Sequence, residues 1–418
     1  MMHHLKLFAL LGVATASLAA PPISVESPEA AGLSSERLNR IDVAMQGYVD
    51  RKDVAGVVAL VARHGKVVYH KSFGNRIAGQ NAPMSNDVIF RIASMTKPIA
   101  SVALMMLYEE GKFQLRDDIA KFLPEFKDMK VAVPPPSGSG PIKLISAGPI
   151  TMMHILSHQS GLANPYRGPN VADYNKIRES RKPDWAIGDY VKELAKLPLN
   201  FEPGTSWEYG PSTDVVGRLV EVLSRQKLDE FLNERIFEPL GMSDTAFYLP
   251  KSKMNRLAAL YVKGKDNKIE LSELPDENSR WIKEPHIYFS GAGGMVSTTS
   301  DYFRFHQMML NGGELEGVRI LGPMTVRLMT SNHIGDKKIW ITGHGAKFGL
   351  GYSVATAVGQ SGLPNSVGTF SWGGAYGTVF TADPEQDMIV VLMSQIRPYS
   401  HLNIRRDLQT LAYSAIID

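Results

Sequence analysis

The chain has 418 residues, with 45 Lys plus Arg against 42 Asp plus Glu, a formal net charge of +3 and 44% hydrophobic residues. This composition is typical of a folded globular protein, and the length fits two or three domains or one large unit with an insertion. The nearly balanced charge, without a long basic run, argues against a nucleic-acid binder. Because the sequence has no cysteine, disulfides, a cysteine nucleophile and an iron–sulfur cluster are excluded.

The first twenty residues predict a secretory signal peptide. Residues 1–6 carry one charge, Lys6, and residues 7–20 form an apolar, small-residue stretch with cleavage sites such as Ser17-Leu18-Ala19. A disordered or expression-derived N-terminus is the alternative. No later segment reaches eighteen uninterrupted apolar residues, so we expect no integral membrane segment. The location predicted on this basis is periplasmic or secreted.

Both ends of the remaining chain predict the same kind of layer. Apolar residues at helical spacing follow Ser34-Ser35 and end near Asp50, and they predict an outer helix. Paired β-branched runs predict two antiparallel hairpins, followed at the C-terminus by an amphipathic helix. These segments are residues 57–62 with 66–73, residues 377–382 with 388–393, and helix 404–413.

The middle of the chain instead predicts helices separated by clear breakers. The expected helices cover residues 98–110, 152–159, 212–224 and 301–310. We therefore predict an α+β fold in which an antiparallel sheet flanked by helices receives an inserted helical domain. The predicted sheet domain covers residues 21–94 and 290–418, the mainly helical domain covers residues 95–289, and the active site lies in the cleft between them.

The strongest chemical signal is Ser94-Met95-Thr96-Lys97. On a helix Ser94 and Lys97 share one face about a turn apart, so the amine can reach the hydroxyl and accept its proton. Pro98 is tolerated only near a helix start, which predicts that Ser94 lies within the first turn. The N-terminus of that helix would offer N–H groups and positive potential to an oxyanion. A serine three residues before a lysine is common by chance, so this motif alone decides nothing.

Two further elements point to the same cleft. Tyr209, in Trp207-Glu208-Tyr209-Gly210-Pro211, is predicted at a loop apex before the helix that begins near Ser212. The strand with Trp372-Gly373-Gly374-Ala375 contains glycines that indicate close approach of another backbone or a ligand. Taken singly, a half-buried tyrosine and a sheet corner explain these features as well.

In this order the three motifs resemble those of the serine β-lactamase and penicillin-binding-protein-like superfamily, nearest to class C β-lactamases and the carboxylesterases of that fold (family VIII esterases). Ser94-x-x-Lys97 is similar to the family's nucleophile motif, Tyr209 to the tyrosine of its Tyr-x-Asn motif, and Trp372-Gly373-Gly374 to its Lys-Thr-Gly strand. The resemblance covers roughly residues 30–415. Flanking segments agree with it: residues 111–117, 154–162, 201–204 and 238–242.

The resemblance implies a β-lactamase/transpeptidase-like fold and acyl transfer through an acyl-enzyme on Ser94. It implies that Lys97 and Tyr209 share the base role, which leaves open which of them carries the proton. The N–H groups of Ser94 and Ala375 are the implied oxyanion hole. Trp372, Gly373 and Gly374 are expected to bind a small-molecule ester, and neither a metal nor a cofactor is expected.

The chain departs from the lactamase pattern at two places. Pro211 stands where lactamases carry Asn, and Trp372 where they carry Lys, which removes a donor and a cation that hold a β-lactam. The Trp-Gly-Gly form is similar to the esterase branch, so we predict hydrolysis of short-chain carboxylic esters. Lys347 or Arg397 could restore the cation. A β-lactamase, a D-Ala-D-Ala peptidase, an acyltransferase and a non-catalytic ligand sensor remain as alternatives.

Other sequence signals are weaker. His154 and His158 have a metal-ligand spacing, but no zincin-type Glu lies between them and no third ligand is near, which favours capping or core roles. The sequence also lacks the G-x-S-x-G elbow of the α/β-hydrolases.

Overall fold

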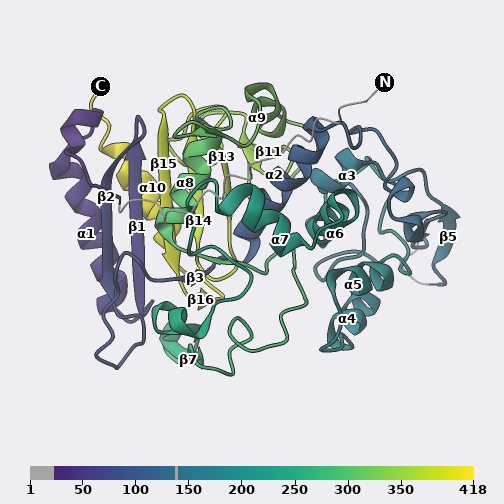
Figure 1. Ribbon diagram of the computed structural model, residues 1–418, viewed down its shortest axis with the longest axis horizontal. Helices are drawn as coiled ribbons and strands as arrows, with labels where there is room; N and C mark the ends of the chain where they lie inside the picture. The colour runs from purple at the N-terminus through teal and green to yellow at the C-terminus, as the bar shows by residue number, and fades with distance from the viewer. Residues whose placement is uncertain (1–22, 137–139) are drawn as a thin grey trace, which may run out of the picture.

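An antiparallel sheet forms the frame of the molecule (Figure 1). The computed structural model describes residues 23–136 and 140–418, so the predicted signal peptide lies outside the described residues and secretion stays a prediction. The sheet has seven strands in the order β11-β12-β13-β14-β15-β1-β2. Their bounds are β1 Gly56–Arg63, β2 Lys66–Gly74, β11 Ala346–Phe348, β12 Ser353–Ala355, β13 Phe370–Gly373, β14 Val379–Asp383 and β15 Met388–Ser394.

The two ends of the chain meet in the middle of this sheet. Strand β1 pairs antiparallel with β15, in a register that runs from Val57 opposite Ser394 to Arg63 opposite Met388. Every residue of both strands is buried. Continuous apolar runs are expected where both faces of a strand are covered. The prediction that the two chain ends build one layer is therefore confirmed, and so is the α+β fold class.

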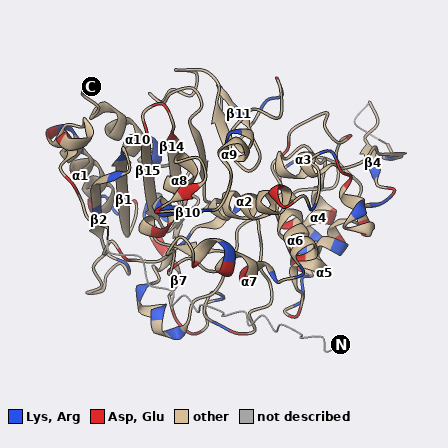
Figure 2. Cartoon of the chain, turned by 45° about the horizontal axis from the view of Figure 1, so that its top comes forward, with Lys and Arg blue, Asp and Glu red and all other residues tan. Residues whose placement is uncertain are grey.

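Helices cover both faces of the sheet. Helices α1 (Ser35–Asp50) and α10 (Ile404–Ser414) pack with Val57 and Val61 on one face. Helices α2 (Thr96–Glu109) and α8 (Thr299–Leu310) pack with the alternate residues, such as Leu60, on the other face. This alternation follows from the period of two in a strand. In Figure 2 the strands are drawn mostly in tan, and charged residues gather on outer helices and loops.

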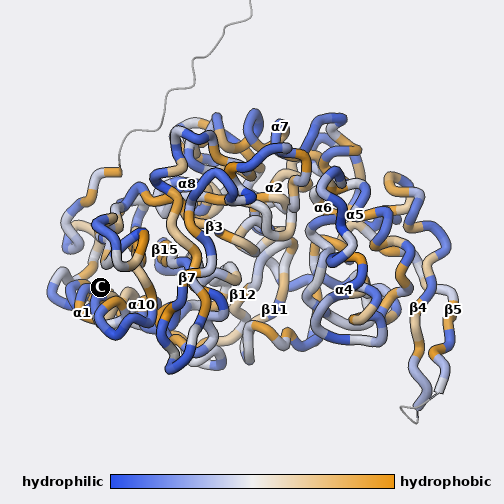
Figure 3. The backbone as a smooth tube through the Cα atoms, turned by 90° about the horizontal axis from the view of Figure 1, so that it is seen from below, coloured by the Kyte–Doolittle hydropathy of each residue, from blue (hydrophilic) through white to orange (hydrophobic). Residues whose placement is uncertain are grey.

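The remaining helices lie mainly beyond α2, at the end of the molecule away from α1 (Figure 1). Their bounds are α3 Met152–Leu156, α4 Val171–Glu179, α5 Ile187–Leu194, α6 Ser212–Ser224, α7 Leu228–Leu232 and α9 Pro323–Met329. A hairpin of β4 (Lys130–Val133) and β5 (Lys143–Ser146) projects from this end, as Figure 3 shows. Within the described ranges, no helix combines the length and apolarity needed to cross a bilayer.

Short strands join the middle of the chain to the sheet side. Strands β6 and β7 lie inside the stretch predicted as mainly helical, yet β6 pairs with β16 near the C-terminus. The domain division at residues 94 and 290 stays a prediction. The bounds are β3 Phe90–Arg91 with β8 Val296–Ser297, β6 Leu260–Lys263, β7 Ile269–Glu273, β16 Ile396–Arg397, and β9 Glu314–Leu315 with β10 Val318–Arg319.

Helix α2 passes through the core and positions the site. Every residue from Thr96 to Leu107 is buried, which matches a helix that is apolar all round. The predicted start at Pro98 was two residues late. Pro98 is the third residue of α2, where its missing N–H leaves no intrahelical bond unmade.

Candidate active site

Ser94 lies in a 3-10 turn, η2 (Ala93–Met95), immediately before α2. The prediction that Ser94 lies within the first turn of the α-helix was therefore wrong, because the 3-10 turn η2 separates Ser94 from the start of α2 at Thr96. Ala93 has φ 45°, in the left-handed region that a side chain disfavours. Holding such a residue costs about 1–3 kcal/mol and is characteristic of functional turns. The strained turn redirects the chain from β3 into α2 and places Ser94 at the junction.

The structure brings Ser94, Lys97 and Tyr209 together. Lys97 Nζ donates to Ser94 Oγ at 3.3 Å, and Tyr209 Oη donates to the same oxygen at 2.6 Å. Lys97 Nζ also lies 4.7 Å from the centroid of the Tyr209 ring. Lys97 and Tyr209 are only 3% and 6% exposed, so solvent competes little for these contacts. The three groups therefore form one hydrogen-bonded unit around the serine oxygen.

Burial shifts the pKa values of Lys97 and Tyr209 in opposite directions. It lowers the pKa of Lys97 to about 8, against the opposing field of Asp214. It raises the pKa of Tyr209 to about 12, partly offset by the hydrogen bond to Ser94. Desolvation disfavours the charged form of each group. Lys97 is therefore the member that titrates nearest neutrality, and Tyr209 keeps its proton.

Asp214 and Ala292 support Lys97, and the sequence analysis missed both. Lys97 Nζ donates to the carbonyl of Ala292 at 2.6 Å. The buried Asp214 carboxylate accepts from Ser290 Oγ at 2.6 Å and from the N–H of Ala292 at 3.2 Å. Asp214 thus holds the N–H of the residue whose carbonyl accepts from Lys97. The small-residue run Gly291-Ala292-Gly293-Gly294 was the available signal, since such runs allow close backbone packing.

The glycines of the β13 motif bring that strand against the serine turn. A side chain at Gly374 would lie 2.2 Å from the carbonyl oxygen of Ile92, two residues before Ser94. This is the close backbone approach that the glycines predicted. The N–H of Gly374 donates to Thr378, whereas the exposed Ala375 donates its N–H to no residue in the described part of the chain. That N–H, beside Ser94 in the same cavity, is free for a ligand oxygen.

Aromatic rings enclose the unit. The Trp372 ring lies 5.4 Å from that of Tyr209, and the Tyr166 ring stacks on Tyr209 at 5.9 Å. His158 joins this cluster at 5.2 Å from Tyr209, and burial lowers its pKa to about 3. His154 instead caps α3, where Thr151 donates its N–H to Nδ1 at 3.3 Å. These are the core and capping roles that the sequence favoured for the two histidines.

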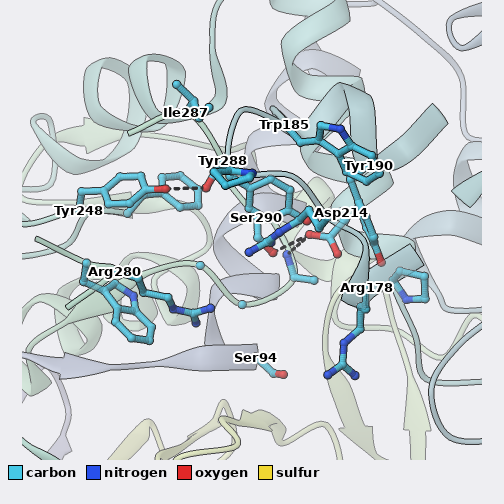
Figure 4. A pocket seen from close by; sticks show the side chains of 18 of the residues that line it. Ser94, Arg178, Trp185, Tyr190, Asp214, Tyr248, Arg280, Ile287, Tyr288 and Ser290 are labelled. Carbon is cyan, nitrogen blue, oxygen red and sulfur yellow. Dashed lines mark hydrogen bonds between the residues drawn. The ribbon is translucent and has the colours of Figure 1, made fainter. Parts of the chain in front are cut away.

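Two cavities flank Ser94. One of about 870 Å³ lies among the helical segments and residues 278–294, and one of about 590 Å³ lies along β11–β13. Of the residues that the structure describes, only Ser94, Tyr166 and Tyr209 line both. Arg397 lines the second cavity together with Trp372, whereas Lys347 donates to the carbonyl of Lys337 instead. Of the two cations left open by the sequence, Arg397 therefore enters the site. Figure 4 shows the larger cavity with Ser94 at its edge.

Fold and site together define a class of enzyme. A serine sits at the head of a buried helix, with a lysine one turn along it, a tyrosine from a second loop and a glycine-rich strand edge opposite. The family model described as Beta-lactamase matches residues 41–413, and the chain belongs to this family. The protein is thus a serine hydrolase with the β-lactamase fold.

The relatives of this chain differ in the activities they are named for. Esterase EstB of Burkholderia gladioli is 28% identical over 380 residues, which cover 85% of this chain and 89% of EstB. A relative in Escherichia coli (strain K12), provisionally named a D-alanyl-D-alanine carboxypeptidase, is 28% identical over 417 residues, or 94% of this chain and 90% of the relative. The structure of EstCE1, a hydrolase with promiscuous acyltransferase activity, superposes with a TM-score of 0.75 at 26% identity, covering 92% of this chain and 99% of EstCE1.

Proposed function

We propose that this protein is a carboxylesterase that hydrolyses short-chain carboxylic esters through an acyl-enzyme on Ser94. The observation that carries the proposal is the serine oxygen held by both Lys97 and Tyr209, beside a strand motif that presents Trp372 instead of a lysine. The similarity to EstB and EstCE1 supports it.

The first half of the reaction forms the acyl-enzyme. Ser94 Oγ attacks the ester carbonyl, and its proton passes to neutral Lys97. The resulting ammonium group is stabilised by its hydrogen bond to the Ala292 carbonyl and by the negative field of Asp214. The N–H groups of Ser94 and Ala375 stabilise the oxyanion. As the carbon–oxygen bond breaks, Tyr209 donates its proton to the departing alkoxide and regains one from Lys97. Water then attacks the acyl-enzyme, with the same groups moving its proton in reverse order.

The side chains along β13 favour an uncharged acyl or alcohol group. Trp372 is 5% exposed and adds a flat apolar wall where related lactamases place an ammonium group. The adjoining cavity of about 590 Å³ exceeds the needs of a butyryl group, so its volume alone sets no chain-length limit. The preference for short acyl chains thus depends on Trp372 and stays a prediction.

A panel of substrates tests the assignment. We expect kcat/KM for p-nitrophenyl butyrate to exceed that for a cephalosporin such as nitrocefin on the same preparation. Without the lysine of the strand motif, a lactam carboxylate loses a charge-assisted hydrogen bond worth about 1.5–3 kcal/mol, or about 10- to 150-fold in rate. Arg397 lies near enough to recover part of this, so slow lactam turnover is compatible with the proposal.

A Trp372→Lys variant provides the matched comparison, because it should narrow the gap between the two substrates. A cephalosporin value equal to or above that of the butyrate ester would overturn the esterase assignment in favour of a β-lactamase. Release of D-alanine from a D-Ala-D-Ala peptide at a rate above ester hydrolysis would favour the peptidase alternative. An ester product formed from added alcohol, in excess over the acid, would favour an acyltransferase.

A further inference from the structure

The larger cavity has walls that the chemistry at Ser94 does not use. One wall comes from residues 178–190, which run from the end of α4 into α5, and the other from residues 278–290, between β7 and β8. Aromatic rings from these walls and from neighbouring segments line the cavity. The rings are Tyr174, Trp185, Tyr190, Tyr248, Trp281 and Tyr288. We name this cavity, of about 870 Å³, the aromatic chamber.

Unpaired cations line the aromatic chamber. They are Arg178, Arg181, Lys182, Arg280 and Lys283, and no carboxylate of the described residues lies within ion-pair distance of any of them. Two neighbouring acids are already occupied, because Asp173 pairs with Lys176 and Glu277 with Lys251.

Few negative charges oppose these cations inside the chamber. Its lining carboxylates are Glu284 and Asp214, and Asp214 is engaged with Ser290 and Ala292. Apart from the catalytic lysine, five cations therefore face two carboxylates. A cleft with a surplus of one sign of charge concentrates ligands of the opposite sign.

Two of the arginines are held over rings. The guanidinium of Arg181 lies 4.2 Å from the Tyr288 ring centroid, and that of Arg280 lies 3.9 Å from the Trp281 ring centroid. Stacking on a ring leaves the in-plane N–H groups of a guanidinium available to a carboxylate. In the view of Figure 4, Arg280 and Arg178 lie on either side of Ser94. The chamber thus offers flat apolar surface and guanidinium donors in a cavity that Ser94 also lines.

We propose that the preferred substrates are esters of which one half is an aromatic or bulky apolar group carrying a carboxylate, and that this half lies in the aromatic chamber. The inference rests on the proposed esterase activity and names its substrate class. It is compatible with the uncharged wall at Trp372, because within the described part of the chain the two cavities share only Ser94, Tyr166 and Tyr209. One half of the ester occupies each cavity.

Two pairs of esters test this and identify which half carries the charge. The first pair is 4-acetoxybenzoate and its methyl ester, which differ in the charge of the alcohol half. The second is p-nitrophenyl hydrogen terephthalate and p-nitrophenyl methyl terephthalate, which differ in the charge of an aromatic acyl half. The charged-to-neutral ratio of kcat/KM is compared between the wild type and Arg178→Gln/Arg280→Gln, so that intrinsic reactivity cancels.

We expect the ratio in one pair to fall about 10-fold in the double variant and to fall in the wild type as salt is raised, because the attraction is screened. The neutral ester of each pair is the internal reference, so that any general effect of the substitutions on hydrolysis cancels in the ratio. Arg40→Gln/Lys127→Gln, which removes two exposed cations outside the chamber, is the matched control. Equal ratios in wild type and variant for both pairs, with the neutral esters still hydrolysed, would overturn this inference alone. No hydrolysis of any ester would overturn the esterase proposal itself.

A second, independent observation concerns Arg405 of α10. Its Nη2 donates to the carbonyl of Gly374, and Gly373 lies so close that a side chain there would be 2.7 Å from Nη1. Burial lowers the pKa of Arg405 to about 10, and it stays charged at neutral pH. No carboxylate in the described part of the chain pairs with it; its other neighbour is the Tyr399 ring, 3.4 Å away. Arg405 is half-buried, and the acceptor that holds its guanidinium is a backbone carbonyl instead of a carboxylate.

The contact acts on one peptide group. The carbonyl of Gly374 and the N–H of Ala375 belong to the same planar trans peptide, in which they point in opposite directions. A guanidinium that holds the carbonyl therefore also restrains the N–H of Ala375, and Arg405, Ala375 and Ser94 line the same cavity. A charged donor on the carbonyl also polarises the peptide and strengthens the N–H as a donor.

We infer that Arg405 is a positioning residue that aims and polarises the oxyanion-hole N–H of Ala375. Removing a whole oxyanion donor costs about 10²–10³-fold in kcat, so weakening one should cost about 10- to 100-fold. Arg405→Met should lower kcat by this factor with little change in KM. It should raise the Ki of a trifluoromethyl ketone, whose adduct places an oxyanion in the hole, by a similar factor.

Two variants separate this role from a loss of stability. Arg405→Lys keeps a charged donor and should recover part of both effects. Arg63→Met removes another buried arginine that binds backbone carbonyls, those of Ala31 and Gly32, far from the site, and should lower stability without changing the ketone Ki. A loss of kcat in Arg405→Met without a matching rise in the ketone Ki would refute the inference, as would unchanged kcat.

Discussion

Replacing Ser94 with alanine is expected to lower kcat/KM for p-nitrophenyl butyrate by about 10⁴-fold or more, since nucleophile removal in serine hydrolases has effects of this size. The fold should survive, because the hydrogen bonds of the Ser94 hydroxyl within the described residues are those to the catalytic groups Lys97 and Tyr209. Steady-state kinetics and thermal unfolding of the same samples measure the two quantities.

Ser101→Ala is the matched control for this experiment. Ser101 lies further along α2, it is 1% exposed, and its oxygen has no hydrogen-bond partner among the described residues. Its loss should leave activity near the wild-type value. Full ester turnover by Ser94→Ala would show that another residue is the nucleophile.

Lys97 and Tyr209 should behave as one unit with Ser94. We expect Lys97→Met and Tyr209→Phe each to lower kcat/KM by about 10²–10⁴-fold, and the double variant to lower it by much less than the product. The reason is that both groups contact a single oxygen, at 3.3 and 2.6 Å. The pH profile adds a second readout: Lys97, with a pKa of about 8, is a base only when neutral, so kcat/KM should rise as pH approaches 8.

In Lys97→Met that rise with pH should disappear. Tyr352→Phe combined with Lys97→Met gives a control cycle, because the buried Tyr352 hydroxyl has no hydrogen-bond partner among the described residues and should act additively. Losses from Lys97→Met and Tyr209→Phe that simply multiply would contradict a shared proton network. A rise with pH that persists without Lys97 would assign the base role elsewhere.

The strained turn at Ala93–Met95 shows which features of the site the local sequence predicts and which depend on the tertiary structure. The sequence placed Ser94 and Lys97 on one face, because the spacing of i and i+3 requires only a helix. It could not show that a 3-10 turn with Ala93 at positive φ precedes that helix. The turn follows β3, which pairs with β8 from a distant part of the chain, so its surroundings depend on tertiary contacts.

The sequence by itself determined the elements at both chain ends and the motif glycines. Alternating and helical apolar patterns carry this information locally. The glycine at position 374 predicted a close backbone approach, and the structure shows it at the carbonyl of Ile92. Only the tertiary structure decided the electrostatics. The low pKa of Lys97 and the high pKa of Tyr209 follow from burial, and Asp214, Ala292 and Arg405 act from other segments. Desolvation and through-space fields depend on packing across the whole chain, which no local pattern encodes.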